Sequence, residues 1–151
     1  MPTVHLTETT TATPQQFIAA LTDFGPQRGK IWRNSQPEYL QIHSLTDTSA
    51  DVTEGSSAGG GTWERLRYDW SQPNHVTMTT IDSNIWGKRS GHSYTLTPTT
   101  GGGATIDVVV VRQGISPKGR LIGMLVGLVG KPLIRRELRK SIEAIEALPA
   151  S

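Results

Sequence analysis

The stretch TWERLRYDWSQPNHVTMTTID (residues 62–82) decides the fold. Its two halves, Thr62–Trp70 and Val76–Asp82, are rich in β-branched and aromatic residues, which favour the pleated surface of strands. The segment between them, Ser71-Gln72-Pro73-Asn74, is short, polar and typical of a turn. So short a connection predicts an antiparallel hairpin, because parallel strands need a longer crossover.

The hairpin also predicts which side chains share a face of the sheet. If Trp70 pairs near Val76, the apolar positions of both strands lie together, and a slip of one residue would exchange the two faces. The positions brought together are Leu66, Tyr68, Trp70, Val76, Met78 and Thr80. Continued through the loop at residues 83–90, the same register sets Asp82, Thr80 and Met78 beside His92, Tyr94 and Leu96, and the last hairpin adds Ile106, Val108 and Val110.

Further strands are expected on both sides of the hairpin. They are Val4–Glu8, Tyr39–Leu45, Ala50–Glu54, Gly91–Thr97 and Ala104–Arg112. Between the first two, Thr13 as N-cap, Pro14 at the first helical position and Gln16 in a capping box predict a short helix. A second short helix would carry Ile31 and Trp32.

Apolar residues at spacings of three and four predict a long C-terminal helix from Ser116-Pro117 onward, kinked or divided at Pro132. They are Leu121, Leu125, Leu128, Leu138, Ile142 and Ile145. Helices gathered at the ends of an antiparallel sheet indicate an α+β domain. With no repeat or linker visible, residues 1–151 are expected to form one domain.

Composition excludes several classes of function. The chain of 151 residues has no cysteine, which excludes thiol catalysis, iron–sulfur clusters and cysteine-ligated zinc, and weakly favours a reducing compartment. We therefore expect a cytoplasmic protein, and the longest apolar run, residues 121–130, is too short to cross a bilayer. Fifteen basic residues against thirteen acidic ones argue against a nucleic-acid binder.

The positive charge is concentrated at the C-terminal end, where seven basic residues face three acidic ones from Lys118 onward. The densest part, residues 131–140, contains Lys131, Arg135, Arg136, Arg139 and Lys140 against Glu137 alone. One interpretation is a solvated helix face near the negative end of the helix dipole. The other is transient contact with an anionic membrane surface.

Three glycines interrupt the expected C-terminal helix: Gly123, Gly127 and Gly130. Each costs about 0.8–1 kcal/mol relative to alanine in a helix, so some other contribution must offset them. Either they leave space for a ligand between helix and sheet, or they allow the helix to pack closely.

The order of elements, together with GGGTWERLRYDW (residues 59–70), SNIWG (residues 83–87) and the glycine-bearing terminal helix, resembles the START/SRPBCC superfamily, in particular its bacterial polyketide cyclase/dehydrase-like members. The resemblance spans nearly the whole chain. It implies a helix-grip fold, in which a curved seven-stranded antiparallel sheet wraps around the C-terminal helix and encloses a mainly apolar cavity. Members bind lipids, sterols, polyketides or plant hormones, and some are aromatase/cyclases; the superfamily has no invariant catalytic motif to transfer.

The expected cavity gives a set of candidate ligand-binding residues from the inward face of the sheet, the aromatic side chains and the terminal helix. They are Trp32, Leu66, Tyr68, Trp70, Met78, Thr80, Trp86, Tyr94, Leu96, Val108, Val110, Leu121, Leu125 and Leu128. Of these, Trp86 is interpreted as core, as a cavity gate or as an exposed membrane anchor.

Four polar residues are candidates for acid–base chemistry or ligand orientation: Glu64, Asp82, His92 and Tyr94. Asp82 and His92 would form a pair that polarises a ligand carbonyl, or would both lie in a solvated rim. An inward Glu64 needs a partner, for which Arg33, Arg65 or the ligand are the candidates. No catalytic role is assigned, and the histidines lack the spacing of a metal site, so no metal or cofactor is expected.

Three functions remain open at this level. The first is a carrier or sequestering protein, monomer or homodimer, for a hydrophobic or amphipathic small molecule. The second is a cofactor-free polyketide cyclase, aromatase or dehydratase. The third is a protein-interaction module, which would be expected to have a solid core without a cavity.

Overall fold

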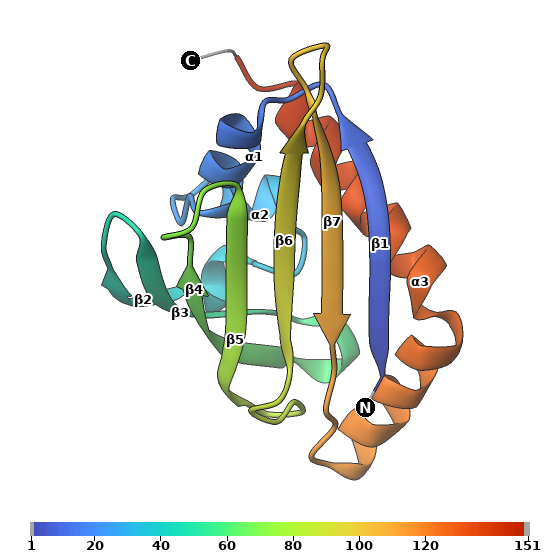
Figure 1. Cartoon of the computed structure of the whole chain (residues 1–151). Helices are drawn as coiled ribbons and strands as arrows, with labels where there is room; N and C mark the ends of the chain where they lie inside the picture. Colours follow the sequence, from blue (N-terminus) through green and yellow to red (C-terminus); the bar gives the residue numbers. More distant parts are fainter. Residues whose placement is uncertain (1, 150–151) are drawn as a thin grey trace.

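The computed structural model describes residues 2–149, which form one seven-stranded antiparallel sheet with three α-helices (Figure 1). The strands are β1 (Thr3–Thr10), β2 (Gln41–Leu45), β3 (Ser49–Ser56), β4 (Thr62–Asp69), β5 (His75–Ser83), β6 (Gly91–Pro98) and β7 (Ala104–Val111). The helices are α1 (Pro14–Leu21), α2 (Arg28–Ile31) and α3 (Pro117–Glu146), with short 3₁₀ turns η1 (Pro37–Tyr39) and η2 (Ala58–Gly60). The strand order is β1-β7-β6-β5-β4-β3-β2.

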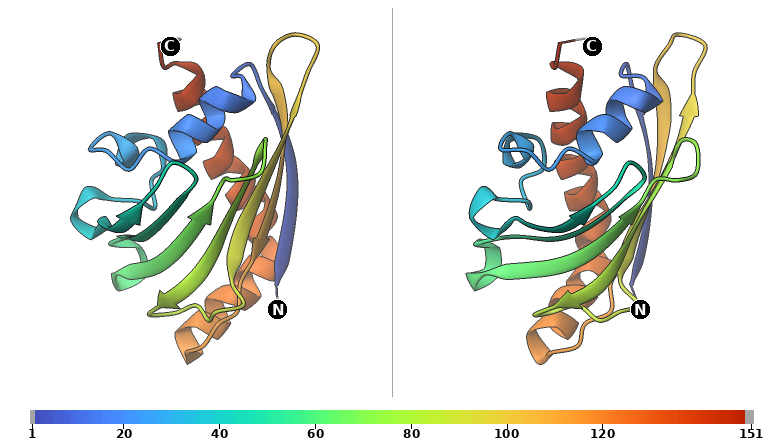
Figure 2. Two further views of the ribbon diagram at one scale, coloured as in Figure 1. Left: turned by 60° about the vertical axis from the view of Figure 1, so that its left-hand side comes forward. Right: turned by 90° about the vertical axis from the view of Figure 1, so that its left-hand side faces the viewer.

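The sheet is strongly curved, and α3 crosses its concave side with α1 and α2 beside it (Figure 2). Helix α3 contacts edge strand β1 as well as α1 and α2. The side chains between sheet and helices form one hydrophobic core. The expected α+β helix-grip architecture, with two short helices after the first strand, is confirmed.

The start of α1 follows the pattern expected from its sequence. The Thr13 hydroxyl accepts a hydrogen bond from the Gln16 backbone N–H at 3.1 Å, and the Gln16 side chain accepts one from the Thr13 backbone N–H at 2.8 Å. This reciprocal capping box satisfies two backbone donors that the first turn leaves open. Helix α1 therefore begins at Pro14, and it buries Phe17 and Leu21 against the sheet.

The register predicted for the β4–β5 hairpin is confirmed: Tyr68 pairs with Met78 and Leu66 pairs with Thr80. The register predicted from β5 to β6 is wrong by four residues, because Met78, not Asp82, lies opposite His92. A shift by an even number keeps the same face inward, so the inward positions of β6 are still correctly identified.

A bulge changes the direction of the last part of β5. Thr80 pairs with Leu66 but Asp82 pairs with Arg65, so Ile81 is an extra residue in β5. An extra residue reverses the alternation of side chains beyond it, and Asp82 therefore points outward and is exposed. The predicted Asp82–His92 pair does not form.

Helix α3 is continuous from Pro117 to Glu146 and is not divided at Pro132. The fully buried core residues of α3 come from its C-terminal half and are Leu138, Ile142 and Ile145, while Val126 and Ile134 pack against the core partly buried. In the N-terminal half the residues that face the protein include Gly119 and Gly123, and the leucines face solvent. The prediction that Leu121, Leu125 and Leu128 line a cavity is therefore wrong.

Gly119, Gly123 and Gly127 lie where α3 approaches the rest of the protein, whereas a Cβ on Gly130 would meet only Val126 and Ile134 of the same helix. A Cβ atom on Gly119 would lie 2.3 Å from the Ile85 carbonyl oxygen, and one on Gly123 would touch Trp86 and Pro2. The glycines at 123, 127 and 130 line neither of the two cavities described below. Close packing, not space for a ligand, is thus the interpretation that agrees with the surroundings of Gly123 and Gly127.

Within residues 2–149, no helix combines the length and apolarity needed to cross a bilayer. The same residues contain no group of three or more His, Asp or Glu side chains arranged to hold a metal ion.

Candidate functional site

Two adjoining cavities lie between the concave face of the sheet and the helices. The larger has a volume of about 320 Å³ and the smaller a volume of about 120 Å³. Five residues line both cavities: Trp32, Asn34, His92, Tyr94 and Arg112. The residues of α3 that line this space are Val126, Leu133, Ile134, Glu137, Leu138 and Ser141, so most of it lies under the later part of the helix.

The wall of the larger cavity is mainly aliphatic. Its aliphatic members come from β7 and α3, and they are Val108, Val110, Val126, Leu133, Ile134 and Leu138. Arg33 and Glu137 also line this cavity, and they form an exposed ion pair of 3.4 Å between Nη1 and Oε1. A cavity with an apolar wall and a few polar groups suits an amphipathic small molecule.

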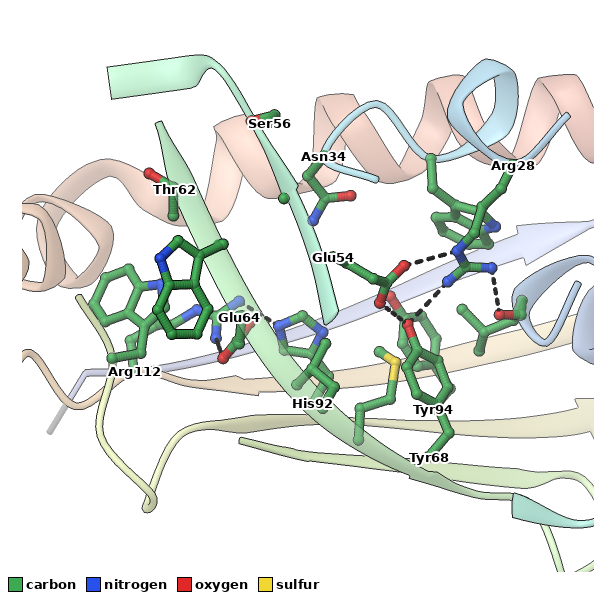
Figure 3. A pocket seen from close by; sticks show the side chains of 17 residues that line it. Arg28, Asn34, Glu54, Ser56, Thr62, Glu64, Tyr68, His92, Tyr94 and Arg112 are labelled. Atoms are coloured by element: carbon green, nitrogen blue, oxygen red, sulfur yellow. Dashed lines mark hydrogen bonds and ion pairs between the residues drawn. The ribbon is translucent and has the colours of Figure 1, made fainter. Parts of the chain in front are cut away.

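The smaller cavity borders a buried ion pair between Arg28 of α2 and Glu54 of β3 (Figure 3). Arg28 Nε lies 2.7 Å from Glu54 Oε1, and only 3% of the Arg28 side chain and 9% of the Glu54 side chain are exposed. Glu54 also accepts hydrogen bonds from the hydroxyls of Ser35 and Tyr68. Arg28 in turn donates to the carbonyl oxygens of Leu21 and Asp23 and to the Tyr68 hydroxyl.

With its guanidinium nitrogens occupied in this way, Arg28 is held as a structural tie between α2, the preceding loop and the sheet. Tyr68 belongs to the same network. Burial, reinforced by the neighbouring Glu54 carboxylate, raises the pKa of Tyr68 well above its ordinary value. The network therefore holds the shape of the smaller cavity without offering a free charge to a ligand.

A second polar cluster lies at the boundary of the two cavities (Figure 3). Arg112 donates from Nη1 to Glu64 Oε2 at 3.2 Å, and its Nη2 contacts His92 Nε2. The Thr80 hydroxyl donates to the same Glu64 oxygen, and the Arg112 guanidinium lies 5.1 Å from the centre of the Trp86 ring. The partner of Glu64 is therefore Arg112, and the predicted partners Arg33 and Arg65 are wrong.

His92 is the member of this cluster with an unused polar atom. Burial, and after it the positive charge of Arg112, hold the pKa of His92 well below its ordinary value, so the ring is neutral near pH 7. Because a guanidinium can only donate, Nε2 accepts from Arg112 and the proton lies on Nδ1. Among the described residues, buried Nδ1 has no hydrogen-bond partner.

Tyr94 lines both cavities as well, and it packs against Phe17 and Trp32 at ring-centre distances of 5.9 and 6.5 Å. Burial raises the pKa of Tyr94 to about 12, so its phenol keeps its proton at all physiological pH values. His92 and Tyr94 are therefore two neutral donors at the boundary of the cavities.

The structure brings together eight of the fourteen candidate ligand-binding residues around the cavities: Trp32, Leu66, Tyr68, Met78, Trp86, Tyr94, Val108 and Val110. Trp86 is buried beside Arg112, so its interpretation as an exposed membrane anchor is wrong. The other six candidates line neither cavity: Trp70, Thr80, Leu96, Leu121, Leu125 and Leu128. Of the polar candidates, Glu64, His92 and Tyr94 line the cavities and Asp82 does not.

Three charged residues of the two buried polar clusters were not predicted from the sequence: Arg28, Glu54 and Arg112. The signal for Glu54 was present, since alternation places it on the same side of β3 as buried Ala50 and Val52. An inward carboxylate requires a cation. No pattern in the sequence shows which arginine supplies it, because the pairing depends on how α2 folds onto the sheet.

Comparisons of the fold agree with this description. No protein-family model matches the chain, and no curated protein matches it in sequence. Among solved structures, TTHA0849 from Thermus thermophilus is similar with a TM-score of 0.77 and 13% identity, over 99% of this chain and 100% of that one. A START superfamily protein from Mycobacterium smegmatis has a TM-score of 0.72 and 12% identity, over 94% of both chains.

The Zhui aromatase/cyclase from Streptomyces sp. R1128 is similar as well, with a TM-score of 0.73 and 13% identity, over 95% of this chain and 93% of that one. At such low identities the likeness shows the fold alone. The chain has the helix-grip fold of the START/SRPBCC superfamily. Proteins of this architecture include START-like and aromatase/cyclase members, and the fold by itself does not choose between them.

Proposed function

We propose that the protein binds an amphipathic small molecule, lipid-like or polyketide-like, as a carrier or sequestering protein. The apolar body of the ligand would occupy the larger cavity, against Val108, Val110 and Leu138. An oxygen of the ligand would accept hydrogen bonds at the boundary of the cavities, from His92 and Tyr94.

The observation that carries this proposal is the combination of an aliphatic wall and an unpartnered donor beside it. A buried N–H without a partner costs about 1–3 kcal/mol, and a ligand carbonyl, hydroxyl or carboxylate oxygen at His92 Nδ1 would remove that cost. The volume of about 320 Å³ lies at the lower end of the range of small-molecule sites. A compact ligand is therefore favoured over a long double-chain lipid.

The test is titration with the amphipathic fluorescent probe anilinonaphthalene sulfonate, followed by displacement with candidate ligands. Val110→Phe adds bulk on the cavity side of β7, and Val109→Phe adds the same bulk on the other side of the same strand. We expect Val110→Phe to weaken probe binding at least about tenfold and Val109→Phe to change it less than about threefold. Equal affinities for the two variants would contradict binding in this cavity.

A second candidate function, a cofactor-free cyclase or dehydratase, is favoured by one specific observation. His92 is neutral, with Nε2 accepting from Arg112 and the proton on Nδ1, which is the state required of a hydrogen-bond donor that polarises the carbonyl of a keto substrate. In that case His92→Gln and Tyr94→Phe should abolish turnover of a poly-keto thioester and leave probe binding intact. Turnover that persists in both variants would exclude this mechanism.

The third alternative, a protein-interaction module, predicts a core without cavities. Two cavities are present between sheet and helices, so this alternative is not proposed.

A further inference from the structure

The N-terminal half of α3 exposes an unusual amount of apolar surface. We call the following six residues the α3 apolar face: Leu121, Met124, Leu125, Leu128, Val129 and Leu133. All six are about half exposed or more, and Leu128 is 75% exposed. Single exposed leucines are ordinary, but six large apolar side chains on consecutive turns of one helix form a contiguous patch, which marks an interaction site.

The orientation of the helix accounts for this patch. At about 100° per residue, Gly119, Gly123 and Gly130 lie on the side of α3 that faces the protein, opposite Leu121 and Leu128. A leucine at position 119 would collide with the Ile85 carbonyl, so the helix packs on its small residues. The large apolar residues are consequently left outside, where nothing in the described chain covers them.

The charge around the patch indicates what could cover it. Between residues 117 and 136 the chain has five basic residues and no aspartate or glutamate. At about 100° per residue, Arg120 and Lys131 lie along one side of the α3 apolar face and Arg136 lies just beyond its C-terminal end at Leu133; all three are exposed. Arg135 already forms an ion pair with Glu8 at 3.0 Å, so it contributes less.

We propose that the α3 apolar face docks on an anionic lipid membrane. Exposed leucines between flanking arginines and lysines are the combination by which a helix lies in a membrane interface, with the apolar side chains among acyl chains and the cations among anionic headgroups. A second copy of the chain is disfavoured as the occupant, because it would bring two unbalanced basic surfaces together.

The docking surface adjoins the proposed ligand site. Leu133 belongs to the α3 apolar face and also lines the larger cavity, so a docked protein would hold that side of the cavity near the membrane surface. The docking proposal does not depend on ligand binding, since the patch and its charges are present whether or not the cavity is occupied.

The experiment is co-sedimentation of the full-length protein with vesicles of pure phosphatidylcholine or with about 30% phosphatidylserine added. Leu125→Gln with Leu128→Gln removes the centre of the patch without changing charge, and Lys131→Gln with Arg136→Gln removes charge without changing the patch. Leu45→Gln, at a residue of β2 that is also about half exposed, is the matched control. Sedimentation equilibrium of each protein without vesicles measures its oligomeric state.

We expect the wild-type protein to bind the anionic vesicles only. Either double variant, or high salt, should weaken this binding at least about tenfold, and Leu45→Gln should leave it unchanged. Absence of wild-type binding to anionic vesicles would overturn the proposal, as would binding that both double variants retain. A wild-type dimer that Leu125→Gln with Leu128→Gln dissociates, with no vesicle binding, would instead assign the face to a second copy. None of these results alters the probe-binding test of the cavity with Val110→Phe.

Discussion

The buried ion pair between Arg28 and Glu54 gives the sharpest test of what holds the site together. Glu54→Gln keeps the shape of the side chain but removes its charge, and it leaves the Arg28 guanidinium uncompensated with 3% of the side chain exposed. Three donors converge on the carboxylate, from Arg28 at 2.7 Å, from Ser35 at 2.6 Å and from Tyr68. The amide cannot accept all three, because one of its two terminal atoms is itself a donor.

Breaking a buried pair by removing one partner costs about 3–5 kcal/mol, and we expect Glu54→Gln to lower the free energy of unfolding by that amount. Urea unfolding followed by tryptophan fluorescence measures it. The control is Glu137→Gln, which breaks the Arg33–Glu137 pair, because that carboxylate is 51% exposed and an exposed pair is worth about 1 kcal/mol or less. A loss below about 1 kcal/mol for Glu54→Gln would refute the view that this network fixes α2 to the sheet.

Two further predictions concern α3 and His92. A Cβ on Gly123 would make an ordinary contact of 3.6 Å with Trp86. Gly123→Ala should therefore raise the free energy of unfolding by about 0.5–1 kcal/mol without changing probe affinity. Gly119→Ala should lower the free energy of unfolding, because its Cβ would collide with the Ile85 carbonyl oxygen. Thermal unfolding measures both, and a loss of probe binding in Gly123→Ala would restore the ligand-space interpretation. The lowered pKa of His92 means that the unfolded chain takes up a proton near pH 6.5 that the folded protein does not, so stability falls as the pH drops below that value. Between pH 7.5 and pH 5, His92→Gln should lose less stability than the wild type. Equal losses in the two proteins would contradict a lowered pKa for His92 in the folded protein.

Local signals predicted much of the fold because each acts over a few residues. The Thr13–Gln16 capping box fixed the start of α1, and the turn at Ser71–Asn74 fixed the β4–β5 register. The longer loop after Ser83 could not fix the next register, since it folds back to bridge Trp86 with Gly114. The four-residue error in that register is the reason that Asp82 was wrongly placed beside His92. The bulge at Ile81 has no signature in the sequence, and it is the reason that Asp82 points outward.

The site was predictable to the extent that it follows strand alternation. Tyr94, Val108 and Val110 were identified because every second residue of an inner strand faces the core. Arg28 and Arg112 were not, because each reaches its carboxylate from a segment distant in the sequence, 26 residues away for Glu54 and 48 residues away for Glu64. Alternation locates positions, whereas charge pairing depends on the complete fold.

The error in α3 has a different cause, and it is informative about function. Apolar residues at spacings of three and four predict a helix correctly, but they predict the buried side only if the largest side chains face the core. In α3 the close approach to Ile85 and Trp86 selects glycine on the inner side, so Leu121, Leu125 and Leu128 face outward. A helix whose apolar side lies opposite the core is stabilised by contact with another apolar phase there, and the basic residues around it favour an anionic membrane as that phase.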